Sequence, residues 1–319
     1  MISHLFEILK RPLLALTIAS FAAAPAWVPA LAAPEAQAGP PPSPPPPPPP
    51  AGRPAPGRPG LAADFLRGVF ATVCDFSHEA PDDPIVKPNQ PGASHLHQFF
   101  GNATTSADST YDSLRAGGTS CRASQDASGY WVPALYKDGA EVQPSSMKVY
   151  YRAGRHDPGS IKAFPAGFRV VAGDATATSP QGQRLTGWVC QGIPGPSEVP
   201  PSCPAGAPLT LHVEFPDCWD GVSSDSPDHK SHTAYGRLGT CPADHPVALP
   251  SLTLLVHYPI TGDPGTVTLS SGSIYSGHAD FFNAWDQSFL TSKVDDCLNA
   301  TVMCGVVADR PLRPLRPRP

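Results

Sequence analysis

Beyond its first 38 residues the chain has no apolar run of about 18 residues, the length that a membrane-spanning helix needs. It has no H-E-x-x-H motif and no C-x₂-C pair, the spacings of common zinc-protease and zinc-ribbon sites. Apolar residues rarely recur with a helical period, and only 15% of the residues are charged. The chain therefore predicts no further membrane span, no familiar zinc motif and few helices.

Charge is unevenly distributed along the chain. The whole sequence has a formal net charge of −5, but residues 61–309 hold 14 of its 22 Lys and Arg and 25 of its 27 Asp and Glu, which gives −11. This part lacks the basic footprint that neutralises phosphates, so nucleic-acid binding is not expected. Neutral glycans and cations are easier partners for an acidic domain.

The two ends of the chain differ from its middle. Lys10 and Arg11 precede an apolar segment that predicts a signal peptide over residues 1–38, cleaved after Ala32 or Ala38, with an uncleaved anchor as the alternative. Residues 39–60 are rich in proline and predict a stiff polyproline II linker. Residues 61–309 are expected to form one secreted domain, and residues 310–319 a disordered Arg/Pro tail. These features predict an extracellular protein, free or associated with a cell wall.

All eight cysteines lie within the predicted domain. An even number of cysteines in an exported chain predicts disulfides rather than metal thiolates. The sequence does not fix the pairing as a whole. The two pairs closest in sequence predict local bridges, Cys190–Cys203 and Cys297–Cys304.

Short extended segments dominate the domain. Strands are predicted where β-branched and aromatic residues cluster between Gly, Pro, Asp and Ser, at residues 147–154, 168–173, 209–215, 252–259 and 265–277. Helices are expected only within residues 61–70 and 283–301. The pattern predicts a mainly β fold: an antiparallel β-sandwich of the jelly-roll kind with long ordered loops and disulfides, or alternatively a β-barrel.

Two pairs of residues with the same spacing are the main candidates for a site. His95 and His97 stand two positions apart in PGASHLHQFFGN, as His278 and Asp280 do in SGHAD. In an extended segment each pair projects from one face, because strand side chains alternate. A polar loop adds three candidates, Asp228, His229 and His232. Together these groups suit either acid–base catalysis or a divalent metal, zinc or copper, with the five histidines as ligands.

A structural role is the alternative for these histidines. His212 and His257 lie in apolar runs and His245 precedes a proline, so these three are expected to be structural. The His97→Ala change separates the two roles. If His97 belongs to a site, the change should abolish metal binding or glycan turnover and leave the melting temperature within a few degrees. If His97 is structural, the change should cost about 1–3 kcal/mol of stability.

Other aromatic and acidic residues complete the candidate site. Five are expected to contact a substrate: Trp131, Tyr136, Asp220, Tyr235 and Trp285. Aromatic rings stack on sugars but also fill cores, and an Asp before Gly is often a turn former, so structural roles stay open for each. Asn102 and Asn299 lie in N-x-T sequons, the acceptor sequence for glycosylation.

Several long segments stand in a fixed order along the chain: DPIVKPNQPGASHLHQFFGN, WVPALY, FPDCWDGVSSDSPDHKSHTAY, CPADHPVALP and SGHADFFNAWD. On these segments, over residues 75–286, the chain resembles an exported bacterial and fungal family catalogued as domain of unknown function nineteen ninety-six. The resemblance implies a single secreted domain. Fungal members often stand beside wall-binding modules, which favours a polysaccharide or cell-wall substrate.

Three classes of function follow. The first is an extracellular enzyme, a hydrolase or lyase, that acts on polysaccharide through a His/Asp cleft. The second is a non-catalytic carbohydrate- or wall-binding module in which the same residues hold loops. The third is a surface protein that binds zinc or copper.

Overall fold

The computed structural model describes residues 68–309, all of which belong to the unit Pro56–Pro319. The predicted signal peptide, the proline-rich linker, residues 61–67 and the Arg/Pro tail lie outside this range and stay predictions. Within residues 68–309, none of the helices is long and apolar enough to cross a membrane.

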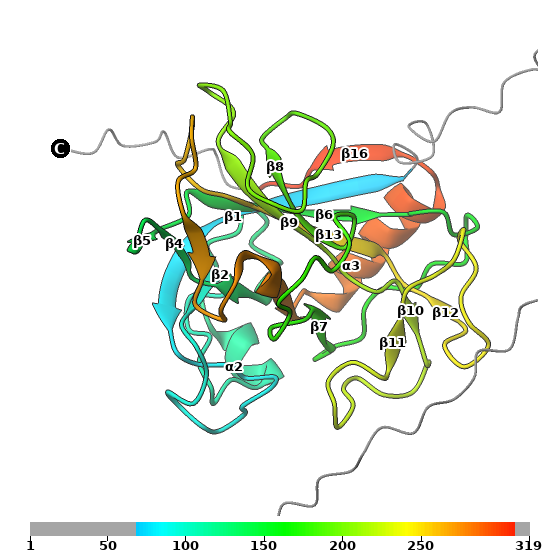
Figure 1. The fold of residues 1–319 in the computed structure, drawn as a ribbon. Helices are drawn as coiled ribbons and strands as arrows, with labels where there is room; N and C mark the ends of the chain where they lie inside the picture. Colours follow the sequence, from blue (N-terminus) through cyan, green and yellow to red (C-terminus); the bar gives the residue numbers. More distant parts are fainter. Residues whose placement is uncertain (1–67, 310–319) are drawn as a thin grey trace, which may run out of the picture. The chain divides into compact units, whose positions relative to one another are not determined.

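Nine strands of the described range form one continuous antiparallel sheet (Figure 1), in the order β7-β15-β3-β2-β1-β6-β13-β9-β8. Their bounds are β1 (Val69–Ala80), β2 (His97–Gly101), β3 (Gly129–Pro133), β6 (Ser146–Arg152), β7 (Arg169–Gly173), β8 (Thr186–Cys190), β9 (Leu209–Glu214), β13 (Ser251–His257) and β15 (His278–Phe282). β7 contacts β9 near the far end of this order, so the sheet curls into a nearly closed, barrel-like form. β16 (Met303–Val306) pairs parallel to β1.

β1 takes part in two halves of the sheet. Its residues Val69–Asp75 pair with β6, and its residues Phe76–Ala80 pair with β2. The register shifts between Phe76 and His78, where the strand passes from one half to the other. The second half continues through β2, β3, β15 and β7, and we call it the histidine half.

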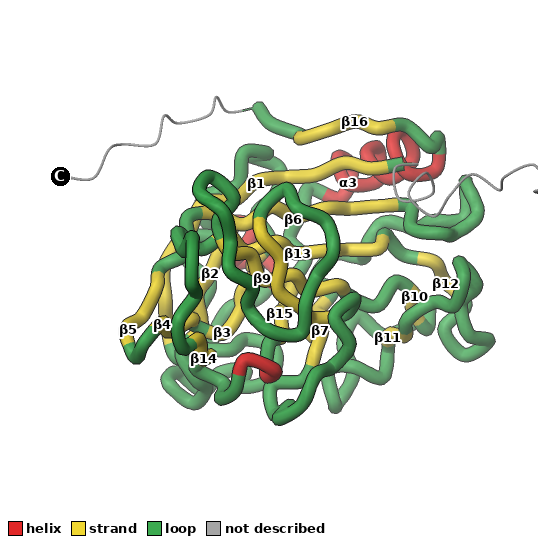
Figure 2. Tube along the Cα trace, turned by 45° about the horizontal axis from the view of Figure 1, so that its top comes forward, coloured by secondary structure: helices red, strands yellow, loops and turns green. Residues whose placement is uncertain are grey.

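Two small sheets and several short helical segments occupy the connections (Figure 2). One sheet contains β4 (Leu135–Lys137), β5 (Ala140–Val142) and β14 (Val267–Leu269), and the other contains β10 (Cys218–Trp219), β11 (Thr233–Ala234) and β12 (Val247–Ala248). The helical segments are α2 (Tyr111–Ala116), η1 (Ile274–Ser276), α3 (Gln287–Lys293) and the π-helical turn η2 (Val294–Asn299) that follows α3. The Thr110 and Asp286 side chains cap the first turns of α2 and α3 and thereby set where these helices begin.

The inner face of the sheet carries the main core. Tyr130 of β3 and Phe281 of β15 stack with ring centroids 5.1 Å apart. Phe70 of β1 stacks on Tyr151 of β6 at 4.6 Å. All four side chains are fully buried and belong to one hydrophobic cluster. Rings from both halves of the sheet therefore meet in a single core.

The outer face of the histidine half is also covered. Phe99, Trp131 and Phe282 alternate with the inward residues of their strands and pack with Ile85 and Leu114 in a second, smaller cluster. Ile85 comes from the loop after β1, and Leu114 comes from α2. Polar residues on this outer face are consequently buried as well.

The predicted fold class is confirmed: the protein is mainly antiparallel β, with long ordered loops and disulfides. The single curled sheet is closer to the barrel alternative than to two separate layers. β6, β7, β9 and β13 coincide with four predicted strands, and β14 covers part of the fifth. α3 and η2 lie in the predicted helical segment 283–301. The helix predicted up to Phe70 is wrong at its end, because Val69 and Phe70 begin β1.

All eight cysteines form disulfides. Cys190–Cys203 and Cys297–Cys304 confirm the two predicted local bridges. The other bridges are Cys74–Cys121, which ties β1 to the loop after α2, and Cys218–Cys241. Such a set is typical of proteins from oxidising compartments.

Candidate metal centre

Three histidines meet on the outer face of the histidine half. Nε2 of His278 lies 3.2 Å from Nε2 of His95 and 3.5 Å from Nε2 of His97. One ring nitrogen of each lies within 4.8 Å of those of the other two. A tetrahedral ion bound at about 2.0–2.1 Å holds its ligand nitrogens about 3.3–3.4 Å apart. The observed spacing therefore fits a metal centre.

Two of the rings are oriented by the backbone. Nδ1 of His97 donates to the carbonyl of Asp82 at 2.9 Å, and Nδ1 of His278 donates to the carbonyl of Ser276 at 2.8 Å. A carbonyl oxygen only accepts, so in each ring Nδ1 carries the proton and Nε2 keeps its lone pair. Backbone carbonyls commonly orient metal-binding histidines in this way.

Burial keeps these imidazoles neutral. Desolvation lowers the pKa of His278 to about 4 and holds the pKa of His97 well below its usual value of 6.5. His95 is only partly buried, and burial lowers its pKa as well. Because neutral imidazole is the form that binds metal, all three rings are available near neutral pH.

The register of the sheet brings His97 and His278 together from distant parts of the sequence. His97 of β2 is paired with Pro133 of β3. On the other side of β3, Asp280 of β15 is paired with Trp131 in an antiparallel ladder, which sets His278 level with Pro133. The two imidazoles therefore approach each other across the same position of β3.

His95 reaches this point from the loop that precedes β2. The amide of Ser94 donates to the carbonyl of Pro81 at 3.0 Å and closes the loop. The Asp82 carboxylate accepts from the amides of Gly92 at 2.8 Å and Ala107 at 3.1 Å. These bonds fix the Asp82 carbonyl that orients His97, so one loop both supplies His95 and positions its neighbour.

A second group of possible ligands adjoins the histidines. Asp83, His97 and Asp280 each offer an atom within 4.8 Å of the other two. Asp280 is fully buried, and neither of its carboxylate oxygens has a hydrogen-bond partner within residues 68–309. Burial raises the pKa of both carboxyl groups, and the neighbouring Asp83 raises that of Asp280 further.

Lys230 and Gly173 border the centre on the side of β7. Gly173 is paired with His278, has φ +85°, and would place a Cβ atom 2.7 Å from the carbonyl oxygen of Gly277. Only glycine fits there without strain. Nζ of Lys230 donates to the carbonyl of Gly173 at 2.6 Å. Burial is the largest cause of the lowered pKa of His278 and of the raised pKa of Asp280. The positive charge of Lys230 adds to the first shift and offsets part of the second.

Two of the three loop residues predicted for the site hold the loop itself. Oδ1 of Asp228 accepts bonds from Ser226, Lys230 and Ser231, which lowers the pKa of this exposed carboxyl group. Nε2 of His232 donates to the carbonyl of Arg169 at 2.7 Å, and its Nδ1 contacts the Ser226 hydroxyl at 2.9 Å. With both nitrogens engaged, His232 has no free lone pair for a metal.

His229 lies nearer to the centre but is outside the three-histidine group. Its Nδ1 bonds to Asp225 at 2.9 Å, and Asp225 lies 3.6 Å from Arg169. Burial raises the pKa of Asp83, and the charge of His229 offsets part of this rise. The loop that carries His229 therefore lies near Asp83. Whether His229 takes part in chemistry stays a prediction.

Three of the five residues predicted to contact a substrate have structural surroundings. Trp131 and Trp285 are fully buried, so neither ring offers a face to a ligand at the surface. Asp220 accepts at 2.8 Å from two amides of its own turn. In the structure Asp220 stabilises its own turn, and the two tryptophans pack in the interior.

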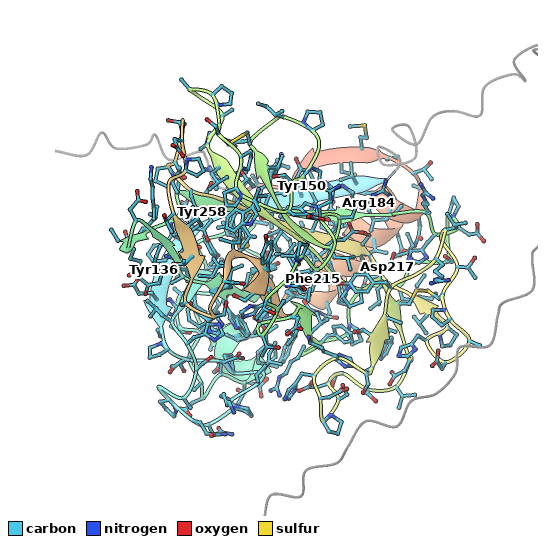
Figure 3. All side chains as sticks on the ribbon, viewed as in Figure 1. Tyr136, Tyr150, Arg184, Phe215, Asp217 and Tyr258 are labelled. Atoms are coloured by element: carbon cyan, nitrogen blue, oxygen red, sulfur yellow. A yellow bond between two sulfur atoms is a disulfide. The ribbon has the colours of Figure 1, made fainter. Side chains whose placement is uncertain are left out.

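Tyr136 and Tyr235 lie apart. Figure 3 shows Tyr136 on the opposite side of the view from Arg184 and Asp217. Tyr235 lies beside Asp217, is 37% exposed, and donates from its hydroxyl to the carbonyl of Glu214 at 2.9 Å. Of these two tyrosines, Tyr235 lines the surface hollows that are described in the next paragraph, and Tyr136 does not.

Two adjoining hollows run from Asp217 toward His278. The larger, of about 320 Å³, and the smaller, of about 260 Å³, share Leu185 and Tyr235. The larger is lined by Arg184, Glu214 and Asp217 among others, and the smaller by Gly173, Asp174, Gln181 and Lys230 among others. Gly173, which lines the smaller hollow, is the strand partner of His278, although none of the three histidines lines either hollow. We call the two hollows together the groove.

Glu214 gives the groove a group that titrates near neutral pH. Burial, and then the charge of Asp217, raise the pKa of Glu214 to about 7. Asp217 accepts from the amide of Gly236 at 2.7 Å and pairs with Nε2 of His156 at 3.0 Å. One carboxyl group is thus firmly held in hydrogen bonds while its neighbour can carry a proton.

Sequence reasoning did not identify Asp83 or Lys230. Asp83 stands in the run Asp82-Asp83-Pro84, which is typical of a turn, and the structure does find a turn there. Lys230 is an exposed residue between two predicted site histidines. Asp83 stands twelve residues before His95, at the start of the same loop, which was the one available signal. This spacing alone does not predict that Asp83 lies near the histidines.

The histidines predicted to be structural hold strands and loops. His257 lies in β13, and its Nδ1 contacts the Thr210 hydroxyl at 2.8 Å. His212 lies in β9, and Nε2 of His245 donates to the carbonyl of Ser231 at 2.9 Å. Asn102, the acceptor residue of its sequon, is fully buried, and its side-chain amide donates to the carbonyls of Leu114 and Ala127. Asn102 is therefore inaccessible to glycosylation in the folded domain.

Comparisons with known proteins define the family but no activity. No curated protein and no solved structure matches the chain significantly. One family model, described as a domain of unknown function (DUF1996), matches residues 83–285. That range begins at Asp83 and includes His95, His97, His278 and Asp280. Because the model covers more than half of the chain, the protein belongs to the DUF1996 family.

Proposed function

We propose that the protein binds zinc or copper at His95, His97 and His278 and uses this centre outside the cell on polysaccharide. The observation that carries the proposal is the approach of Nε2 of His278 to Nε2 of His95 at 3.2 Å and to Nε2 of His97 at 3.5 Å. In His97 and His278 the other ring nitrogen, Nδ1, donates to a backbone carbonyl. These bonds leave Nε2 unprotonated in both His97 and His278, so two lone pairs face each other at 3.5 Å and repel, and a cation between them removes the repulsion.

The groove supports a polysaccharide as the substrate. It joins two adjoining hollows, it includes Gly173, the strand partner of His278, and it mixes carboxylates, basic groups and the partly exposed ring of Tyr235. Hydroxyl groups of sugars can both donate to and accept from such a lining, and a tyrosine ring can stack on a sugar face. The pKa of Glu214, raised to about 7, suits a general acid that protonates a leaving sugar oxygen. Hydrolase and lyase chemistry are both compatible with these groups.

An extracellular location is supported by the disulfides. Four bridges in one domain persist in an oxidising environment and are rare in reducing compartments. Secretion, with or without attachment to a cell wall, is therefore part of the proposal.

Metal binding is tested first, on the disulfide-bonded protein after removal of metals with a chelator. Isothermal titration with Zn²⁺ and with Cu²⁺ should show tight binding of one ion, and the His278→Ala variant should lose it. A wild-type protein that binds neither ion more tightly than the variant would contradict the proposed centre.

Action on polysaccharide is tested with the metal-loaded protein. A panel of cell-wall polysaccharides is read by new reducing ends for hydrolysis and by ultraviolet absorbance for lyase products. Products that disappear in the His278→Ala protein support the enzyme. Glycan binding without products, unchanged in His278→Ala, would instead identify a carbohydrate- or wall-binding module. Metal binding without any glycan response would identify a metal-binding surface protein.

A further inference from the structure

Three polar atoms on the outer face of the histidine half lack hydrogen-bond partners within the described range. They are both carboxylate oxygens of Asp280 and Nε1 of Trp131, and all three are buried. Asp280 and Trp131 are directly paired across β15 and β3. Buried polar groups are nearly always hydrogen-bonded or bound to a cation. The indole N–H of Trp131 only donates and cannot bind a cation, so the two unpaired oxygens of Asp280 are the atoms that indicate a missing cation.

We propose that Asp83 and Asp280 bind a second divalent cation beside the histidine centre. Oδ1 of Asp83 accepts from the amides of Ile85 and Val86, both at 2.9 Å, which fixes the carboxylate and leaves Oδ2 as a ligand. Asp280 offers two oxygens. Two carboxylates match the charge of a divalent ion, and an ion between them removes the repulsion of two buried negative groups.

The ligand atoms select the class of ion. Carboxylate oxygens favour harder cations such as Mn²⁺ or Mg²⁺, whereas the three imidazoles favour zinc or copper. His97 stands within 4.8 Å of both carboxylates and also belongs to the histidine group. An imidazole nitrogen binds one ion at a time, so His97 Nε2 serves the histidine centre and the second ion depends on the two aspartates. Two adjacent ions with this arrangement form a dinuclear centre, whose ions are typically about 3.5–4 Å apart.

No neighbouring cationic side chain takes the place of this ion among residues 68–309. Lys230 is the basic group whose charge acts on Asp280, but its Nζ is exposed and donates to the carbonyl of Gly173. His229 and the exposed Lys87 act on Asp83 through their charge only, and His229 is paired with Asp225. The Asp280 carboxylate is therefore left to an ion that enters the site.

The test loads metal-free protein with one equivalent of Zn²⁺ and then adds Mn²⁺. Electron paramagnetic resonance measures free Mn²⁺, and elemental analysis after gel filtration measures both metals per chain. The wild-type protein should retain about one Zn²⁺ and one Mn²⁺. Retention of zinc with no manganese would overturn the second site, and this result depends on no variant folding.

Two variants assign the ion to its ligands. Asp280→Asn should keep zinc and weaken Mn²⁺ binding by at least about a hundredfold, because one anionic ligand is lost. Asp126→Asn changes another fully buried carboxyl group, one with hydrogen-bond partners, and should keep both ions. Equal Mn²⁺ binding by wild-type and Asp280→Asn proteins would overturn the assignment.

The second ion rests on the proposed histidine centre as its neighbour, but the two sites can be tested independently of each other. In the His95→Ala protein zinc should be lost while the two aspartates remain, so Mn²⁺ binding should persist. If wild-type protein binds Mn²⁺ and no zinc, the histidine centre is wrong and the aspartate site stands. If it binds zinc and no Mn²⁺, the reverse holds.

Discussion

Two buried polar clusters lie on opposite faces of the histidine half, and they differ in how their atoms are paired. On the inner face, the Tyr130 hydroxyl donates to Asp126 at 2.9 Å and contacts the Tyr151 hydroxyl at 2.7 Å, to which Trp285 Nε1 donates at 2.9 Å. The other Asp126 oxygen accepts from the amide of Ser128 at 3.1 Å. Every group of this inner network has a partner.

The outer cluster of His95, His97, His278, Asp83 and Asp280 has the opposite property. The Nε2 lone pairs of His97 and His278 face each other at 3.5 Å, and the Asp280 carboxylate has no hydrogen-bond partner in the described range. Burial is the same in both clusters for Asp126 and Asp280, which are fully enclosed. Pairing, not burial, therefore distinguishes the inner network from the outer cluster, for which we propose metal binding.

The largest expected effect is on the zinc binding that we propose for the outer cluster. His95→Ala should raise the Kd for Zn²⁺ at least about a hundredfold, because a direct ligand is removed. Since His95 is partly exposed, the free energy of unfolding of the metal-free protein should change by no more than about 0.5 kcal/mol. Titration calorimetry and urea unfolding measure the two quantities.

His245→Ala is the matched control, because it removes an imidazole that holds a loop elsewhere. It should leave the Kd for Zn²⁺ unchanged. Two results together would contradict a metal site in the outer cluster: a large loss of stability in His95→Ala, and a Kd for Zn²⁺ that rises as much in His245→Ala as in His95→Ala.

The next effect concerns pH and the inner network. Burial raises the pKa of Asp126 to about 7, above its usual value of 3.8. Between these values the folded protein holds a proton that the unfolded chain releases, so this group makes the protein less stable as the pH rises from about 4 to 7. Asp126→Asn is neutral at every pH. At about pH 8 it should be more stable than the wild type by on the order of 2–4 kcal/mol.

The buried histidines of the outer cluster have the opposite pH dependence, whereas the raised pKa values of Asp83 and Asp280 act in the same direction as that of Asp126. The pKa of His278 is lowered to about 4, so between about 6.5 and 4 the unfolded chain binds protons that the folded one excludes. Its contribution to stability is therefore lost as the pH falls. Urea unfolding of the wild-type and Asp126→Asn proteins at about pH 5 and pH 8 separates the pH dependence due to Asp126 from that due to the other groups. An Asp126→Asn protein whose stability follows the same pH curve as the wild type would contradict this account.

A smaller effect is expected when one hydroxyl of the inner network is removed. Tyr151→Phe keeps the ring that stacks on Phe70 at 4.6 Å but leaves Trp285 Nε1 without its acceptor. An unpaired buried donor of this kind costs about 1–3 kcal/mol, measured by urea unfolding. Zinc and manganese content should be unchanged, and a loss of either would show that the two clusters are coupled.

The sequence predicted the strand class and four of the five residues of the outer cluster, all except Asp83. The spacing of two residues correctly indicated that His95 and His97 share a face, and the repeated spacing drew attention to His278 and Asp280. The sequence could not place β15 beside β3, because no local pattern encodes which strands pair. The approach of His278 to His97 therefore depends on a tertiary arrangement.

The expected behaviour of His97→Ala needs a correction for the same reason. His97 was expected to line a solvent-filled cleft, but it is fully buried and donates to the carbonyl of Asp82. Its removal should therefore lower stability as well as metal affinity, so loss of stability no longer distinguishes a structural histidine from a ligand here. The partly exposed His95 provides the cleaner test.

The smallest effect is expected in the loop that borders the outer cluster. His229 is paired with Asp225, and both side chains are partly exposed, at 21% and 23%. Such pairs contribute about 0–1 kcal/mol, because solvent screens the charges, so His229→Ala should change the free energy of unfolding by less than about 1 kcal/mol. It should also leave one zinc and one manganese per chain, since His229 belongs to neither group of ligands. Elemental analysis decides the point. A variant that folds normally but loses manganese would place His229 beside Asp83 as a ligand of the second ion, and the boundary drawn here between cluster and loop would be wrong.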